Sequence, residues 1–128
     1  MSMGYKDLGY VTLPVAERLT ENLRVKHDSG VCVVAGADTA GIGTVFDSPF
    51  DDPRATIALY NKPGTQIMIA SAAINAGADV YAAAEGKVSM LPTDAGTYYK
   101  VGVALTVAKA DGDGVEVAPN GACLPVTV

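Results

Sequence analysis

The side chains that most often carry out catalysis are few in this sequence and are not grouped into a reactive set. His27 is the only histidine, and it follows an apolar run at the point where a strand is expected to end. A nucleophile needs a base beside it, and the sequence contains neither a Gly-x-Ser-x-Gly elbow nor a Cys-plus-His signature. The sequence therefore predicts a protein that is not an enzyme, with His27 at its surface.

Acidic residues near glycines form a second group that could bind a ligand. The run Asp111-Gly112-Asp113-Gly114 resembles the start of a calcium loop, but apolar residues follow where further oxygen ligands are needed. Asp47, Asp51 and Asp52 could hold a hard cation loosely, although a solvated acidic loop explains them better. Because Asp and Gly are residues that tight turns require, we expect turns and loops here, with no metal and no cofactor.

Two glycine-containing stretches also lack the context of a nucleotide site. Gly41-Ile42-Gly43 is followed by Phe46 where a third dinucleotide-binding glycine belongs. Gly86-Lys87 is followed by valine, where a phosphate-binding loop needs Ser or Thr beside magnesium. Both stretches are predicted to be turns.

The two cysteines, Cys32 and Cys123, lie far apart in the chain and show no Cys-x-x-Cys spacing. The expectation is two reduced thiols packed inside the protein. If folding brought their Cα atoms within about 7 Å, they could instead oxidise to a disulfide. Spacing in the sequence leaves both possibilities open.

Composition excludes several kinds of partner. The 128 residues carry nine Lys and Arg against fourteen Asp and Glu, a net charge of −5, and the basic residues are scattered singly. Nucleic acid is an unexpected partner because phosphate binding needs clustered cations. No window approaches the ~20 apolar residues of a membrane span. The first residues lack the pattern of a signal peptide, so we expect the chain to be made in, and stay in, the cytoplasm of the producing cell.

Short apolar runs closed by Gly with Asp, Glu or Asn predict an all-β domain, a small β-barrel or sandwich. Hairpin turns are expected at 28–30 and 61–64, and a helix or a turn at 15–24. No long-period repeat is visible. Residues 10–128 are predicted to form a single domain, preceded by an extended arm over residues 1–9. The expected strands cover residues 10–15, 23–27, 31–35, 42–46, 55–60, 66–70 and 124–128, with a string of tight hairpins over 76–117.

The arm and the start of the first strand supply the candidate contact residues. Tyr5, Lys6 and Tyr10 combine amphipathic rings with a cation, which suits an interface with a partner or with another copy of the chain. A frayed terminus is the alternative.

The pattern of the last two thirds of the chain resembles a known family. The runs are Gly77-Ala78-Asp79-Val80-Tyr81, Gly86-Lys87-Val88, Val101-Gly102-Val103-Ala104-Leu105 and 111–117, with a weaker likeness at 61–64. They resemble the capsid cement, or head decoration, proteins of tailed phages. The resemblance implies a β-barrel or β-tulip domain on the outer capsid surface of the virion. It also implies a structural protein that stabilises the expanded head, with the major capsid protein as partner and a homotrimer as assembly.

Two other functions stay open. One is a carbohydrate- or ligand-binding β module of a phage tail or fibre protein, although the chain has no Trp and Tyr98-Tyr99 is its only adjacent aromatic pair. The other is a small hydrolase on a β scaffold, which would need a metal because the chain has one histidine.

Overall fold

The computed structural model describes residues 9–49, 52–119 and 125–128 of the chain. Strands account for nearly all of its regular structure, which confirms the all-β prediction. Within the described residues the one helical element is the 3₁₀ turn η1 (Ala84–Gly86). No helix in this part of the chain is long and apolar enough to cross a membrane.

A helix at 15–24 does not form, because the backbone donors of this segment bond to distant partners. The N–H of Leu19 donates to Ser48 Oγ at 2.9 Å, and the N–H of Asn22 donates to the Val45 carbonyl at 2.8 Å. Asn22 also has a positive φ of 70°, which ends any local helix. The alternative of a turn, at 21–22, is the one that the structure contains.

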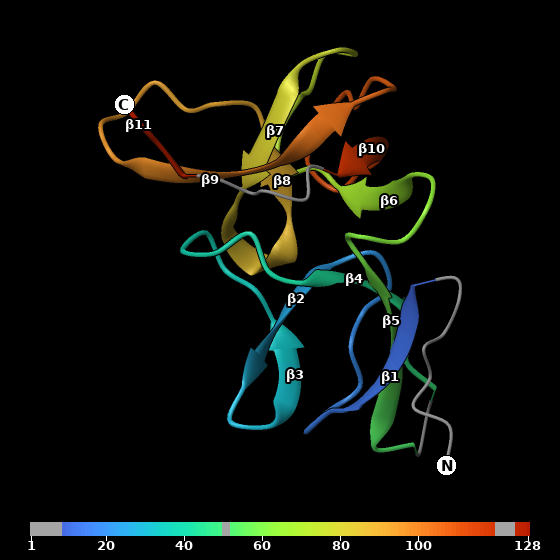
Figure 1. Ribbon diagram of the computed structural model, residues 1–128. Coiled ribbons are helices and arrows are strands. Elements are labelled where there is room, and N and C mark those ends of the chain that lie inside the picture. The colour runs from blue at the N-terminus through green and yellow to red at the C-terminus, as the bar shows by residue number, and fades with distance from the viewer. Residues whose placement is uncertain (1–8, 50–51, 120–124) are drawn as a thin grey trace.

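The strands fall into two groups, which we call the N-terminal unit and the C-terminal unit (Figure 1). The N-terminal unit is an antiparallel sheet with the strand order β1-β5-β4-β2-β3. Its strands are β1 (Tyr10–Pro14), β2 (Arg24–Asp28), β3 (Val31–Val34), β4 (Gly43–Asp47) and β5 (Arg54–Leu59).

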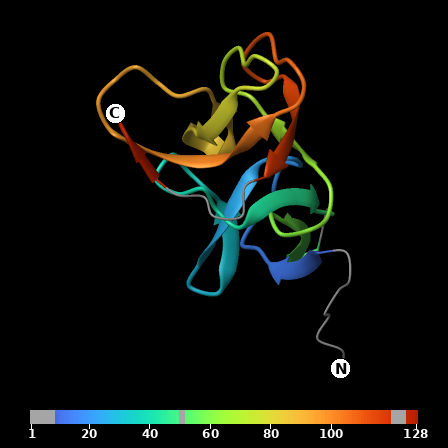
Figure 2. The same cartoon turned by 45° about the horizontal axis from the view of Figure 1, so that its top comes forward.

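The C-terminal unit is an antiparallel sheet with the order β6-β10-β9-β7-β8. Its strands are β6 (Gln66–Ile69), β7 (Asp79–Ala82), β8 (Val88–Ser89), β9 (Thr97–Ala104) and β10 (Gly114–Pro119). A further strand, β11 (Pro125–Thr127), pairs with the first residues of β9. Figure 2 shows β9 and β11 as a two-stranded ribbon that extends away from the rest of this unit.

The two units have the same strand order when β6 to β10 are matched to β1 to β5. Each sheet also curls until its two outer edges meet at one parallel bridge. The bridge joins Val15 to Cys32 in the N-terminal unit and Ala70 to Val88 in the C-terminal unit. The expectation that the chain has no repeat is therefore wrong at the level of structure. The repeat leaves little trace in the sequence because few of the matched residues are identical.

Matched backbone contacts confirm the correspondence between the units. Asn22 N–H donates to the Val45 carbonyl at 2.8 Å, and Gly77 N–H donates to the Ala104 carbonyl at 2.7 Å. Asn22 and Gly77 both have positive φ, 70° and 86°. The turns that join β2 to β3 and β7 to β8 likewise each contain two consecutive positive-φ residues, as tight hairpin turns require.

Each unit has a core built from the same matched positions. Val25 and Val80 pair with Gly43 and Gly102 on the neighbouring strand in their respective units. At both glycines an added Cβ would lie inside contact distance of a carbonyl oxygen on the next strand, Ala58 or Ala118. Glycine is required at these two positions because the strands approach so closely.

The core of the N-terminal unit contains Val15, Leu19, Val25, Cys32, Val45, Ala55 and Ile57. The core of the C-terminal unit is centred on Met68, Ala70, Ile74, Val80, Val88, Ala104, Val115 and Val117.

Two predicted hairpins are wrong. Within the string of hairpins predicted over 76–117, residues 90–96 join β8 to β9, but β8 pairs with β7 and not with β9. The turn at 61–64 joins β5 to β6, but these strands do not pair; β5 pairs with β1 and β4, whereas β6 pairs with β10. The residues are suitable for a turn, yet here they lead the chain from one unit into the other. The turn at 28–30 does join a hairpin, of β2 and β3, as predicted.

Candidate contact groove at the junction of the two units

Arg24 lies at the centre of the junction and is completely buried. Its guanidinium donates to four carbonyls within about 3 Å, and three of these are the carbonyls of Thr39 at 2.7 Å, Gly36 at 2.9 Å and Lys87 at 2.9 Å. A fourth short bond runs to the Ala83 carbonyl at 2.6 Å, and longer ones reach Ala40 and Ala35. Arg24 thus ties the loop that leads into β4 to the β7–β8 turn of the other unit.

Burial lowers the pKa of Arg24, while Tyr60 and Asp38 partly oppose that change. An arginine nevertheless stays protonated in proteins, and carbonyl dipoles around its charge replace the lost water. Tyr60 lies in the same network, where its hydroxyl donates to the Ala40 carbonyl at 2.5 Å. Since the guanidinium is enclosed and its donors are used, Arg24 holds the units together and does not serve as a ligand site.

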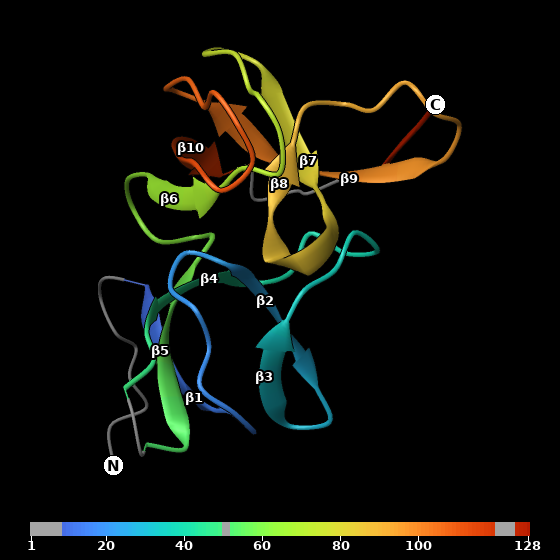
Figure 3. The same ribbon diagram turned by 180° about the vertical axis from the view of Figure 1, so that it is seen from behind.

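A groove of about 210 Å³ opens at the surface of the same junction. Figure 3 shows from behind how β6 comes close to β4 and β5 in this region. The groove is lined from both units, by Tyr10, Asn22, Thr44, Val45, Phe46, Ala58, Lys62, Thr65, Gln66 and Ile67. Junctions between packed units are common locations for binding sites.

Aromatic side chains form one wall of the groove. The rings of Tyr10 and Phe46 pack edge to face with centroids 4.9 Å apart, and Lys62 Nζ lies 5.9 Å from the centre of the Tyr10 ring. Phe46 is nevertheless 57% exposed, and Ile67 on the opposite unit is 46% exposed. Such large apolar side chains in solvent, beside an aromatic pair, are typical of contact surfaces.

The floor of the groove is polar and fixed in position. Thr44 Oγ1 donates to Gln66 Oε1 at 2.7 Å, and Gln66 Nε2 donates to the Leu59 carbonyl at 2.7 Å. Lys62 Nζ is held by the carbonyls of Pro63 and Thr65, both at 3.0 Å. Among its lining residues the groove contains one cation and no carboxylate, on a chain with a net charge of −5. It can therefore take an apolar side chain, with an acidic group beside Lys62.

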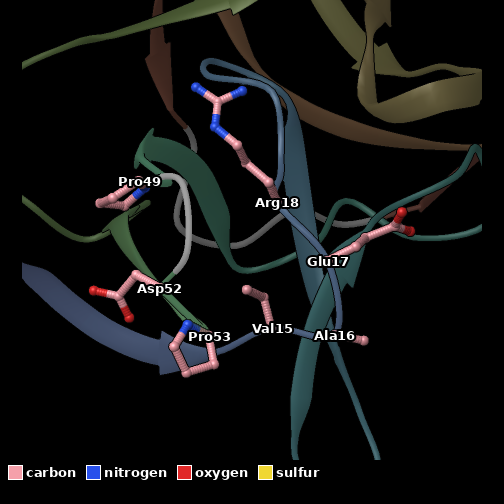
Figure 4. Close-up of a pocket in the computed structure, with 7 residues that line it drawn as sticks. All are labelled: Val15, Ala16, Glu17, Arg18, Pro49, Asp52 and Pro53. Carbon is pink, nitrogen blue, oxygen red and sulfur yellow. The ribbon is translucent and has the colours of Figure 1, made fainter.

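A second hollow, of about 300 Å³, is lined by Val15, Ala16, Glu17, Arg18, Pro49, Asp52 and Pro53. Figure 4 shows that the ends of the Glu17, Arg18 and Asp52 side chains point in different directions. The Asp52 carboxylate accepts from the Arg54 N–H at 3.0 Å and lies 3.5 Å from the Arg54 guanidinium. Since its polar groups do not converge on one point, this hollow is the weaker candidate.

Of the three predicted contact residues, the structure places Tyr10 in the groove. Tyr5 and Lys6 lie outside the described residues, as does most of the predicted arm. Gly9, assigned to that arm, already joins the sheet, because its carbonyl accepts the Leu59 N–H at 2.9 Å. Sequence reasoning missed Phe46, Lys62 and Ile67. Strand alternation gives no signal for Phe46, because Gly43, Thr44 and Val45 are all buried and the pairing register shifts between Val45 and Asp47.

The other residues that the sequence analysis considered for chemistry do not line the groove. His27 is exposed on β2 and Cys32 is buried on β3, where burial raises the pKa of its thiol. Cys123 lies outside the described residues, so its distance from Cys32 stays open. The Asp113 carboxylate accepts from the N–H groups of Lys109 and Ala110, which is the geometry of a turn. Across the described residues no three His, Cys, Asp or Glu side chains are grouped to hold a metal ion.

Comparison of the chain with protein-family models and with curated protein sequences finds no match.

Proposed function

We propose that this chain is a structural virion protein that binds the outer surface of a tailed-phage capsid and stabilises the expanded head, working as a homotrimer. The observation that carries this proposal is the exposed Tyr10–Phe46 surface on two units locked together by Arg24. Together with the resemblance of 77–117 to cement proteins, it favours a binding role over a reaction.

A rigid body with a small apolar contact suits this task. Each closed unit resists deformation, and the buried arginine fixes the angle between the units, so little order has to be gained on binding. Phe46 and Ile67 offer an anchor of the kind that dominates interfaces, with the Lys62 cation at its edge. Several copies in one trimer would add weak contacts into a firm attachment.

The test is co-sedimentation of the purified chain with expanded capsids of its own phage that lack it, with unexpanded procapsids as the control. We expect saturable binding to expanded shells at a stoichiometry that matches the capsomer junctions. Absence of binding to either shell would overturn the proposal, and a glycan array would then test the carbohydrate-binding alternative.

A matched pair of variants locates the contact. Phe46→Ser should weaken capsid binding at least about tenfold, because a buried anchor contributes more than about 1.4 kcal/mol. Leu91→Ser removes an apolar side chain that is also exposed but lies outside the groove lining, and it should bind as the wild type does. Thermal unfolding should hardly change in either variant. Equal binding by both would move the contact away from the groove.

A further inference from the structure

The contact between the two units is made by different faces of the same fold. The N-terminal unit contributes Leu23, Arg24 and Val34, which we call its head face, and the C-terminal unit contributes the β7–β8 turn. A Cβ on Gly86 in that turn would lie 2.9 Å from Val34 and 3.0 Å from Leu23. Figure 1 shows the turn directed at the N-terminal unit. A head face meets a turn, so the arrangement is head-to-tail and not two-fold.

The head face of the C-terminal unit is more exposed at its centre than the head face of the N-terminal unit. Asp79 occupies the position of Arg24 and is exposed, whereas Arg24 is completely buried. Val103 occupies the position of Thr44 and is half-buried, whereas Thr44 is only 3% exposed.

The turn of the N-terminal unit is also uncovered. Gly30 matches Gly86, yet a Cβ on Gly30 would meet nothing within 4 Å. His27, Asp28 and Ser29 beside it are exposed. Figures 1 and 3 show this β2–β3 turn at the end of the molecule farthest from the C-terminal unit.

We propose that a second copy of this chain covers the free head face, by placing its β2–β3 turn on the C-terminal unit of the first. The occupant is identified by the contact inside each chain, where the matched turn already packs on the matched face. Arg24 donates to carbonyls of the turn that it meets. The Asp79 carboxylate, which pairs with Lys100 at 3.2 Å, can instead accept further hydrogen bonds. The incoming turn has donors to offer it in the Ser29 hydroxyl and the His27 ring.

Head-to-tail contacts either close into a ring or continue into a filament. A ring of three copies would bring six similar units around one axis, which suits the homotrimer of the proposed function. The inference does not depend on that function, because copies would associate in this way with no capsid present.

Sedimentation velocity of the purified chain tests the proposal without any capsid. We expect assemblies larger than the 13.1 kDa chain at high protein concentration. Val103→Arg blocks the head face, Asp28→Trp blocks the turn, and each variant alone should sediment as a monomer. When the two are mixed, one intact contact remains, so they should form a dimer and nothing larger.

Two controls keep the test specific. Thr12→Arg and Asp94→Trp place the same new side chains at exposed positions away from both faces, and these variants should assemble as the wild type does. A wild-type chain that stays monomeric at its solubility limit would overturn the proposal. So would assemblies that survive both blocking variants, or a mixture that stays monomeric.

Discussion

Arg24 and Asp79 stand at matched positions in two units with the same strand order, yet one is an enclosed cation and the other an exposed anion. Arg24 bonds to backbone carbonyls from both units. Asp79 pairs with Lys100 at 3.2 Å, with both side chains partly in solvent. The difference shows that the fold repeats, whereas the chemistry at a position follows from what covers it.

The largest expected effect comes from removing the covered charge. Arg24→Met should lower the free energy of unfolding by at least about 3 kcal/mol, because several buried carbonyls lose their donor. Asp79→Asn, at the matched position, should cost less than about 1 kcal/mol since its ion pair is exposed. Urea unfolding followed by circular dichroism measures both. Similar losses in the two variants would contradict the distinction between covered and free faces.

A lysine in place of Arg24 provides a check on the geometry of this site. An ammonium has three donors on one nitrogen and cannot reach carbonyls on both sides of the junction as the guanidinium does. Arg24→Lys should therefore recover little of the stability lost in Arg24→Met, although it keeps the charge. Full recovery would mean that charge alone is sufficient at this position.

The next largest loss of stability is expected at two matched glycines, which test whether the two units are equivalent. Gly43→Ala and Gly102→Ala should each cost about 1–3 kcal/mol, because the added Cβ collides with a carbonyl oxygen of the adjacent strand. The two losses should be similar, since the strands approach in the same way in both units. Thermal unfolding of the two variants, side by side, makes the comparison. A loss in one variant alone would show that the matched strands are not energetically equivalent.

The smallest expected effect comes from exchanging matched core residues. Cys32 and Val88 occupy the same bridge position, so Cys32→Val gives the N-terminal unit the residue of its counterpart. The change keeps volume nearly constant and should alter stability by less than about 1.5 kcal/mol near neutral pH.

The pH dependence of this variant has a defined sign. Burial raises the pKa of the Cys32 thiol, so the folded chain keeps the proton to higher pH than the unfolded chain does. Stability is then lost as the pH rises above the ordinary thiol pKa of about 8.5, where only the unfolded chain ionises. Cys32→Val should remove that part of the decline. Identical stability profiles for the variant and the wild type between pH 8 and pH 10 would show that Cys32 does not contribute.

Local chemistry in the sequence predicted the strands well and their partners less well. Alternating apolar residues and glycine turns located β1 to β5 within a residue or two. The hairpin predicted across 61–64 is wrong, since turn residues do not reveal whether the flanking strands pair. The sequence does not reveal the repeat, because most of the matched positions need only a small or apolar residue. Gly43 and Gly102 are among the few that are identical, since close strand approach tolerates nothing larger.

The candidate site was predictable only in part, because it is assembled from segments far apart in the chain. Tyr10 is predicted from its residue type at the start of the first predicted strand. Phe46 and Ile67 come together only once one unit is stacked on the other. No pattern in the sequence marks Arg24 as buried, since its acceptors are backbone carbonyls, which every residue has.

The bonds of Arg24 also have a consequence for how long the native state lasts. Its partner Lys87 lies 63 residues further along the chain, so we predict that the bonds from Arg24 to the C-terminal unit form late in folding, when the two units stack. Contacts that form after the rate-limiting barrier slow unfolding without accelerating folding. In stopped-flow experiments Arg24→Met should therefore unfold faster than the wild type and fold at nearly the same rate. If so, the bonds of Arg24 break early in unfolding, and they lengthen the lifetime of the folded molecule without changing how fast it forms.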